Sequence, residues 1–234
     1  MDFIFPENPD LGKYKLVIVP ALYVASDQLL EQINDYIRNG GHVIMQFKSG
    51  FSDENSMVRP VLAPGPLREA CGFYYQEFSN IKSLPLKDNP FDVEENTATD
   101  WMEFLIPETA EPLAYYDHPY FSKYPAVTIN NFGEGTLLYE GSVLSDQIQA
   151  RIIREAIARA GISNPDHQFA WPIIAKSGIN DQGNRVHFYY NYSSDQADLS
   201  YPHPPGNELV FGEKVELGDP LEIEPWGVII IEEN

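Results

Sequence analysis

The segment 15–47 restricts the fold of this chain more than any other. It begins with a continuous apolar run, Leu16–Val19, of the kind found in strands that are buried on both faces. Ser26 can cap a helix in which apolar residues recur at helical spacing, and Gly40 can end that helix. A second apolar run, Val43–Phe47, follows closely. This order predicts a β-α-β unit, in which the two strands are parallel and the crossover is right-handed.

The remaining sequence extends this unit into two predicted domains. Phe3–Phe5 is predicted to be a short strand, strand signals recur over residues 101–139, and a second helix ends at Gly161. We therefore expect an α/β domain over residues 1–162, with a mostly parallel sheet and flanking helices. Residues 170–234 lose the helical periodicity and predict a small antiparallel, β-sandwich-like domain.

The charge and the single cysteine exclude several classes of function. The chain has 35 acidic and 15 basic residues, and the resulting net charge of −20 opposes binding to nucleic acid or to an anionic membrane surface. No apolar run approaches the roughly 20 residues that cross a bilayer. Cys71 has no second cysteine with which to form a disulfide within the chain. No signal-peptide pattern follows Met1, so a cytoplasmic location is slightly favoured, although the sequence leaves the compartment open.

Motifs that carry chemistry are missing from the sequence. It contains neither a GxGxxG phosphate loop nor a GxSxG nucleophile turn, and Cys71 falls in a helix-like segment where we expect it to be packed and inert. The acids are too numerous for proximity in sequence to identify a catalytic pair. The histidines follow no metal-binding spacing and are expected to be solvated or packed: His42, His118, His167, His187 and His203. The sequence thus predicts no catalytic residue, metal site or cofactor.

One polar loop leaves a predicted strand at the edge of the sheet where ligands bind in α/β folds. This loop follows Phe47, and two interpretations of it remain open. It is either a solvated connection, or a contact with a partner subunit or with the rim of a neighbouring site. Its candidate residues are Lys48, Ser49, Gly50, Asp53, Glu54 and Asn55.

Several motifs follow one another along the first part of the chain: a strand and Pro20–Tyr23, a helix and Gly40-Gly41, a strand and Ser49-Gly50, and then Asp53–Asn55 and Pro64–Glu69. This order resembles the trimerisation domain of family 42 glycoside hydrolases, which are β-galactosidases. Two later motifs resemble the end of that domain and the small β-domain that follows it in the family: the hairpin Phe132–Gly135 and the segment Pro225–Val228.

The resemblance implies more than the residues show. Such enzymes carry both catalytic glutamates in a (β/α)8 barrel that precedes this region, so no catalytic residue can be carried over and the chain alone is expected to be inactive. It implies an amidotransferase-like or flavodoxin-like sheet, a homotrimer in the intact parent, and a galactoside substrate bound only by the parent's barrel. The loop Lys48–Asn55 becomes the candidate for a subunit contact or active-site rim. A strand and a helix normally precede the counterpart of Phe3–Phe5 in the family, so the chain resembles a fragment.

A sugar- or small-molecule-binding module with an amidotransferase-like fold is the alternative. It is motivated by the loop at the strand end and by aromatic side chains that could stack on sugar rings. The same side chains could instead alternate between core and edge packing on their strands. The residues concerned are Tyr115, Tyr116, Tyr189 and Tyr190.

Overall fold

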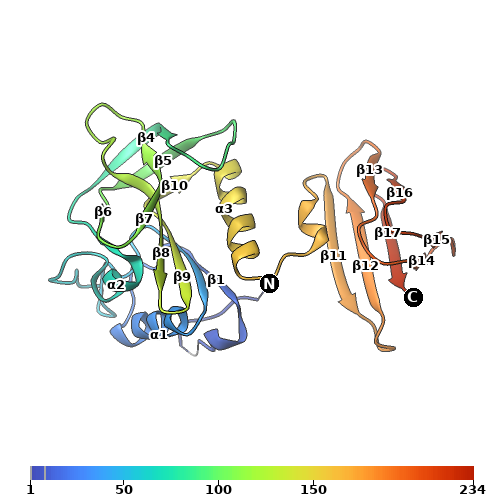
Figure 1. The fold of residues 1–234 in the computed structure, drawn as a ribbon, viewed down its shortest axis with the longest axis horizontal. Coiled ribbons are helices and arrows are strands. Elements are labelled where there is room, and N and C mark those ends of the chain that lie inside the picture. Colours follow the sequence, from blue (N-terminus) through green and yellow to red (C-terminus); the bar gives the residue numbers. More distant parts are fainter. Residues whose placement is uncertain (1, 8) are drawn as a thin grey trace. The chain divides into compact units, whose positions relative to one another are not determined.

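The computed structural model describes residues 2–7 and 9–234 and divides into two compact units, Met1–Ile162 and Ser163–Asn234. Each unit has a hydrophobic core of its own, and the chain passes from the first unit to the second once (Figure 1). Within the described residues, no helix is both long enough and apolar enough to span a membrane.

An eight-stranded sheet forms the centre of the first unit, in the order β1-β2-β9-β8-β7-β4-β5-β10. The strands in that order are Leu16–Val19, His42–Gln46, Gly135–Glu140, Pro125–Phe132, Glu111–Tyr116, Phe78–Lys87, Thr97–Glu103 and Ser142–Leu144. A short pair, β3 (Phe73–Tyr74) and β6 (Ile106–Pro107), lies outside this sheet.

The predicted β-α-β unit is confirmed. Helix α1 spans Asp27–Arg38, and the hydroxyl of Ser26 accepts the backbone N–H of Leu29 at 3.2 Å as its N-cap. Strands β1 and β2 are parallel, with Leu16 opposite His42. Strand β9 also runs parallel to β2.

The expectation of a mostly parallel sheet was wrong. Only β1, β2 and β9 form parallel pairs among the described strands of this sheet, and every other neighbouring pair is antiparallel. The physical reason lies in the connections, because a parallel pair needs a long crossover whereas a short turn joins strands antiparallel. β8 and β9 are joined by the tight turn at Gly133, as in any hairpin. The amidotransferase-like or flavodoxin-like topology is therefore not confirmed, and the fold is a mixed α/β fold with few helices.

Phe3–Phe5 does not form a strand. Phe3 and Phe5 are 84% and 73% exposed, and only Ile4 of these three residues packs against the core. β1 therefore lies at the edge of the sheet, with β2 as its one strand partner in the described part of the chain.

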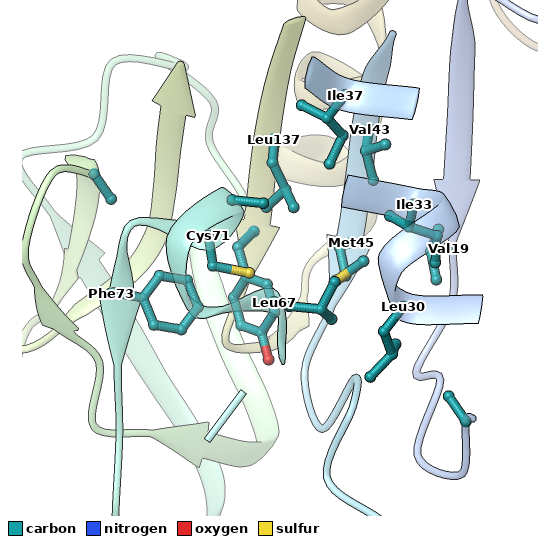
Figure 2. Close-up of a cluster of buried hydrophobic side chains, with 14 of the residues drawn as sticks. Val19, Leu30, Ile33, Ile37, Val43, Met45, Leu67, Cys71, Phe73 and Leu137 are labelled. Atoms are coloured by element: carbon teal, nitrogen blue, oxygen red, sulfur yellow. The ribbon is translucent and has the colours of Figure 1, made fainter. Parts of the chain in front are cut away.

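Helices cover both faces of the parallel part of the sheet. Side chains alternate along a strand, so Val43 and Met45 face α1 and the short helix α2 (Arg68–Cys71), whereas Ile44 faces α3 (Asp146–Arg159). Figure 2 shows the first of these cores, in which Leu30, Ile33 and Ile37 of α1 approach Val43, Met45 and Leu137. The 3-10 turns η1 (Leu11–Lys13) and η2 (Gly65–Leu67) border the same core.

The second unit is antiparallel throughout its described strand pairs. Its larger sheet has the order β11-β12-β17-β14-β15, and β13 pairs with β16 in a separate ribbon. Tyr189, Tyr201 and Ile231 are fully buried in its core. The elements are η3 (Pro165–Gln168), β11 (Ile173–Ile179), β12 (Arg185–Asn191), β13 (Ala197–Ser200), β14 (Gly206–Glu208), β15 (Lys214–Val215), β16 (Pro220–Ile223) and β17 (Val228–Glu233).

Candidate functional site at the C-terminal end of β2

The first half of the predicted loop is part of the framework of the first unit. Lys48 has a positive φ of 57°, and its backbone N–H donates to Glu103 Oε1 at 2.8 Å. The Ser49 hydroxyl donates to the carbonyl of Gln46 at 2.7 Å and accepts the N–H of Leu22 at 3.2 Å. Ser49 and Gly50 are buried. These residues hold the chain in place where it leaves β2.

The second half of the loop is an exposed turn. Asp53 Oδ1 accepts the backbone N–H groups of Asn55 and Met57, both at 2.9 Å. Glu54 and Asn55 are exposed. The six predicted residues therefore do not converge on one point: three lie at the base of the loop and three on its outer turn.

Three aromatic rings lie around the ammonium of Lys48 and a fourth, that of Phe51, packs on two of them; we call these five residues the Lys48 cluster. The ammonium lies 3.8 Å from the centre of the Trp101 ring, 5.4 Å from Tyr23 and 5.5 Å from Phe78. Phe51 stacks on Tyr23 with ring centres 5.4 Å apart, and Phe78 stacks on Trp101 at 4.6 Å. Cation–π attraction holds the lysine over the indole. The sequence predicted Lys48 but not Trp101 or Phe78, which come from distant strands and follow no spacing rule.

Glu103 supports this cluster from inside the fold. Its carboxylate is fully buried and accepts the indole N–H of Trp101 at 3.4 Å and the hydroxyl of Tyr139 at 2.9 Å, besides the N–H of Lys48. Burial raises the pKa of Glu103 to about 7, and these hydrogen bonds partly offset that rise. A carboxyl with three internal donors and no exposed surface is an anchor for Lys48 and Trp101 and cannot reach a substrate.

The other buried acid of the sheet, Glu140, is held in a similar way. It accepts the side-chain amides of Gln149 on α3 at 2.7 Å and of Gln46 on β2 at 3.3 Å. Burial again raises the pKa of this carboxyl to about 7. Cys71 is also fully buried, and desolvation raises the pKa of its thiol well above the ordinary value. It remains a protonated, unreactive thiol, as the sequence predicted.

Exposed apolar side chains follow Tyr23 and Phe51 of the Lys48 cluster in the chain, and we call them the apolar rim: Val24, Met57, Val58 and Val61. Ser52 forms isolated bridges with both Val24 and Val58, so these two residues flank Ser52 on either side. The loop is fixed by Arg59, whose guanidinium donates to the carbonyls of Ala25 at 2.6 Å and Gly50 at 3.1 Å. The rim is therefore a fixed apolar surface.

A second cluster of titratable groups lies inside the second unit. Asp166, His187 and His203 bring one potential metal-ligand atom each within 4.8 Å of the others, and no other group of this kind occurs among residues 2–7 and 9–234. The sequence alone does not reveal this cluster, because the three residues lie on η3, on β12 and beyond β13, and no short spacing connects them.

Comparison with known proteins identifies the family. A family model described as the β-galactosidase trimerisation domain matches residues 1–163. The chain belongs to the β-galactosidase trimerisation domain family. The resemblance drawn from the motif order is thereby confirmed.

Two relatives of this trimerisation domain chain are similar over all or nearly all of its length. It is 29% identical to β-galactosidase BgaB of Geobacillus sp. (strain Y412MC61), covering 100% of this chain and 34% of that protein. It is 29% identical to β-galactosidase Pbg of Clostridium perfringens, covering 95% and 33%. The chain thus spans about a third of the length of these curated relatives.

Solved structures show the same fold. The β-galactosidase from Bacillus circulans sp. alkalophilus is similar with a TM-score of 0.85 at 23% identity, over 97% of this chain and 34% of that one. The β-galactosidase from the haloarchaeon Halorubrum lacusprofundi has a TM-score of 0.76 at 26% identity, over 97% and 32%. The trimerisation domain match includes the Lys48 cluster and the apolar rim, whereas the cluster at Asp166 lies beyond its last residue.

Proposed function

We propose that this chain is the non-catalytic assembly region of a β-galactosidase, and that its first unit makes the contacts between the subunits of a trimer. The observation that carries the proposal is the match of the trimerisation domain family over residues 1–163, which spans the whole first unit. The named β-galactosidases are about three times as long as the chain. In this proposal, terminal β-galactosides are bound and hydrolysed by a part of the parent enzyme that this chain does not span.

The apolar rim and the Lys48 cluster are the proposed contact surface, either with a partner subunit or with the rim of its active site. Met57, Val58 and Val61 are each about 60% or more exposed, although Arg59 and the bridges at Ser52 hold their backbone in place. A fixed group of exposed apolar side chains is typical of an interaction surface. The polar turn at Asp53–Asn55 would then lie at the edge of the contact, where interfaces are polar.

A charge placed on the rim tests this surface. Val58→Lys should weaken the association of subunits at least ~10-fold, because an apolar contact would have to bury an unpaired ammonium. Tyr120→Lys is the matched control, since Tyr120 is 80% exposed on the first unit and lies outside the rim. Sedimentation velocity over a range of concentrations would measure both. If Val58→Lys associates as strongly as the unaltered chain, the rim is not the contact surface.

The absence of chemistry in the chain itself is also open to test. The described acids that are fully or almost fully buried in the sheet, Glu103 and Glu140, are occupied as hydrogen-bond acceptors. We therefore expect no turnover of a chromogenic galactoside above background. Turnover that disappears when one particular acid is replaced would contradict the proposal.

The sugar-binding alternative has less support. Of the tyrosines that motivated it, Tyr116 and Tyr189 are fully buried, so their faces are closed to a sugar ring. The half-exposed rings of the Lys48 cluster are better placed, but the ammonium of Lys48 already covers the Trp101 ring at 3.8 Å. Isothermal titration with galactose and lactose at millimolar concentration separates the two proposals: measurable heat favours binding, and its absence favours assembly alone.

A further inference from the structure

Three side chains converge inside the second unit although they are distant in sequence. Asp166 Oδ1 lies 2.7 Å from His203 Nε2, and Asp166 Oδ2 lies 3.7 Å from His187 Nδ1. The two imidazole rings stack with their centres 3.8 Å apart and their planes inclined by 21°. All three side chains are less than 10% exposed. The carboxylate therefore faces both imidazoles within the interior.

His187 carries the observation that decides how this cluster is used. Its Nε2 lies 2.8 Å from Glu233 Oε1, an arrangement in which the ring donates Nε2–H to the carboxylate. Nδ1 then presents a lone pair toward Asp166, and it has no hydrogen-bond partner among the described residues. A buried acceptor without a donor is destabilising, because nothing replaces the hydrogen bonds that it makes with water. Nδ1 of His187 is thus free to bind a cation.

The surrounding groups favour a cation. Tyr189 donates its hydroxyl to Asp166 Oδ1 at 3.2 Å, so a second polar group orients the carboxylate. In metal sites, a histidine ligand usually donates its other ring N–H to a carboxylate, which fixes the orientation of the ring. Glu233 accepts such a hydrogen bond from His187. Two imidazole nitrogens and one carboxylate oxygen form a common donor set for Zn²⁺, with a water completing a tetrahedron.

We propose that Asp166, His187 and His203 bind one zinc-class divalent cation in the second unit. The cation takes the place of the hydrogen bond between His203 and Asp166 and accepts the lone pair of His187 Nδ1. It joins η3 to β12 and to the segment after β13, three elements that short-range pairing does not connect. A small β unit buries a low fraction of its surface, and small domains of this kind often depend on a metal or a disulfide for stability. The bound cation would stabilise the second unit in this way.

Metal titration of the unaltered chain is the primary test. After treatment with a chelator, the chain should bind one Zn²⁺ with a Kd in the micromolar range or tighter, measured by isothermal titration. Binding should shift the side-chain NMR signals of His187 and His203 and leave those of His118, in the first unit, unchanged. No binding of Zn²⁺ at micromolar concentration, or binding that leaves both histidine signals in place, would overturn the proposal. This readout needs no variant and so does not depend on the folding of one.

Substitutions assign the ligands. His203→Gln should weaken Zn²⁺ binding by about 100-fold or more, and Glu233→Gln by about 10–100-fold, because the first removes a ligand and the second only its support. His118→Gln is the matched control and should bind as the unaltered chain does. Circular dichroism identifies which variants are folded. A folded His203→Gln chain that binds Zn²⁺ with unchanged affinity would show that the cluster is a hydrogen-bonded pair without a metal.

Discussion

Glu103 connects parts of the first unit that are far apart in the sequence. Its oxygens accept the backbone N–H of Lys48 after β2, the indole of Trp101 on β5 and the hydroxyl of Tyr139 on β9. Removing a carboxylate from water favours its protonated form, and this burial raises the pKa of Glu103 from 4.5 to about 7. The stability of the first unit is therefore linked to pH through this one group.

The sign of that linkage gives a prediction for Glu103→Gln. The pKa of Glu103 is higher in the folded state than in the unfolded state. Its contribution to the free energy of unfolding is therefore fully present below about pH 4.5 and is lost as the pH rises through about 7. Glutamine does not ionise, so the variant should not lose this stability. Between pH 5 and pH 8, the free energy of unfolding of the variant minus that of the unaltered chain should rise by roughly 1–3 kcal/mol. Urea unfolding at both pH values would measure it. Glu134→Gln, at an exposed position, is the control, and parallel curves for Glu103→Gln and the unaltered chain would contradict the account.

The candidate residues show what sequence can and cannot predict at this scale. Lys48–Asn55 was located because a loop after a buried strand can be recognised from local pattern. Trp101, which lies against Lys48, and His203, which lies against Asp166, were not found. Each pair is brought together by tertiary packing of strands and loops that carry no common spacing. The role proposed for the loop remains a prediction.

At the scale of elements, local signals predicted α1, β1 and β2 but failed at Phe3–Phe5, and they did not predict how the strands pair. The capping residue Ser26 and the helical spacing that follows predicted α1, and the apolar runs on either side predicted β1 and β2. The same apolar runs are compatible with either parallel or antiparallel pairing of the strands that follow. After α2, the consecutive strands β4 and β5, β7 and β8, and β8 and β9 pair antiparallel, and the first two of these pairs contain register shifts. Strand direction is thus set by connections that hydrophobic pattern does not encode.

The end of α2 offers a prediction at this scale. Gly72 has a φ of +68°, and a Cβ there would lie 2.6 Å from Asn130 Cγ and from Thr109 Oγ1. Its carbonyl also accepts the N–H groups of Glu108, Thr109 and Ala110 at 2.8–3.0 Å. Gly72→Ala should lower the free energy of unfolding by about 3 kcal/mol or more, through left-handed backbone strain and these contacts.

Gly161, which follows the C-cap of α3, supplies the control for that experiment. Gly161 has a similar φ of +63°, but a Cβ there would meet nothing within 4 Å. Gly161→Ala should therefore cost only the backbone term, about 1–2 kcal/mol. Urea unfolding of both variants separates strain from steric contact. Equal losses at the two positions would show that the packing around Gly72 relaxes without cost.

At the scale of the whole molecule, we propose that the two units are separate domains with separate tasks, bounded as residues 1–162 and 170–234. Each has its own core, and the trimerisation domain match ends at residue 163, where the second unit begins. The first unit carries the apolar rim, and the second carries the proposed cation site. Assembly should thus be a property of the first unit alone.

The mass of the two units in solution tests that claim most directly. The whole chain and a fragment of residues 1–162 should each sediment at three times the mass of one copy, because we propose that the contacts of the trimer lie in the first unit. A fragment of residues 163–234 should sediment as a monomer. The account would be contradicted if the whole chain forms trimers while the first unit stays monomeric at every concentration, or if the second unit assembles on its own.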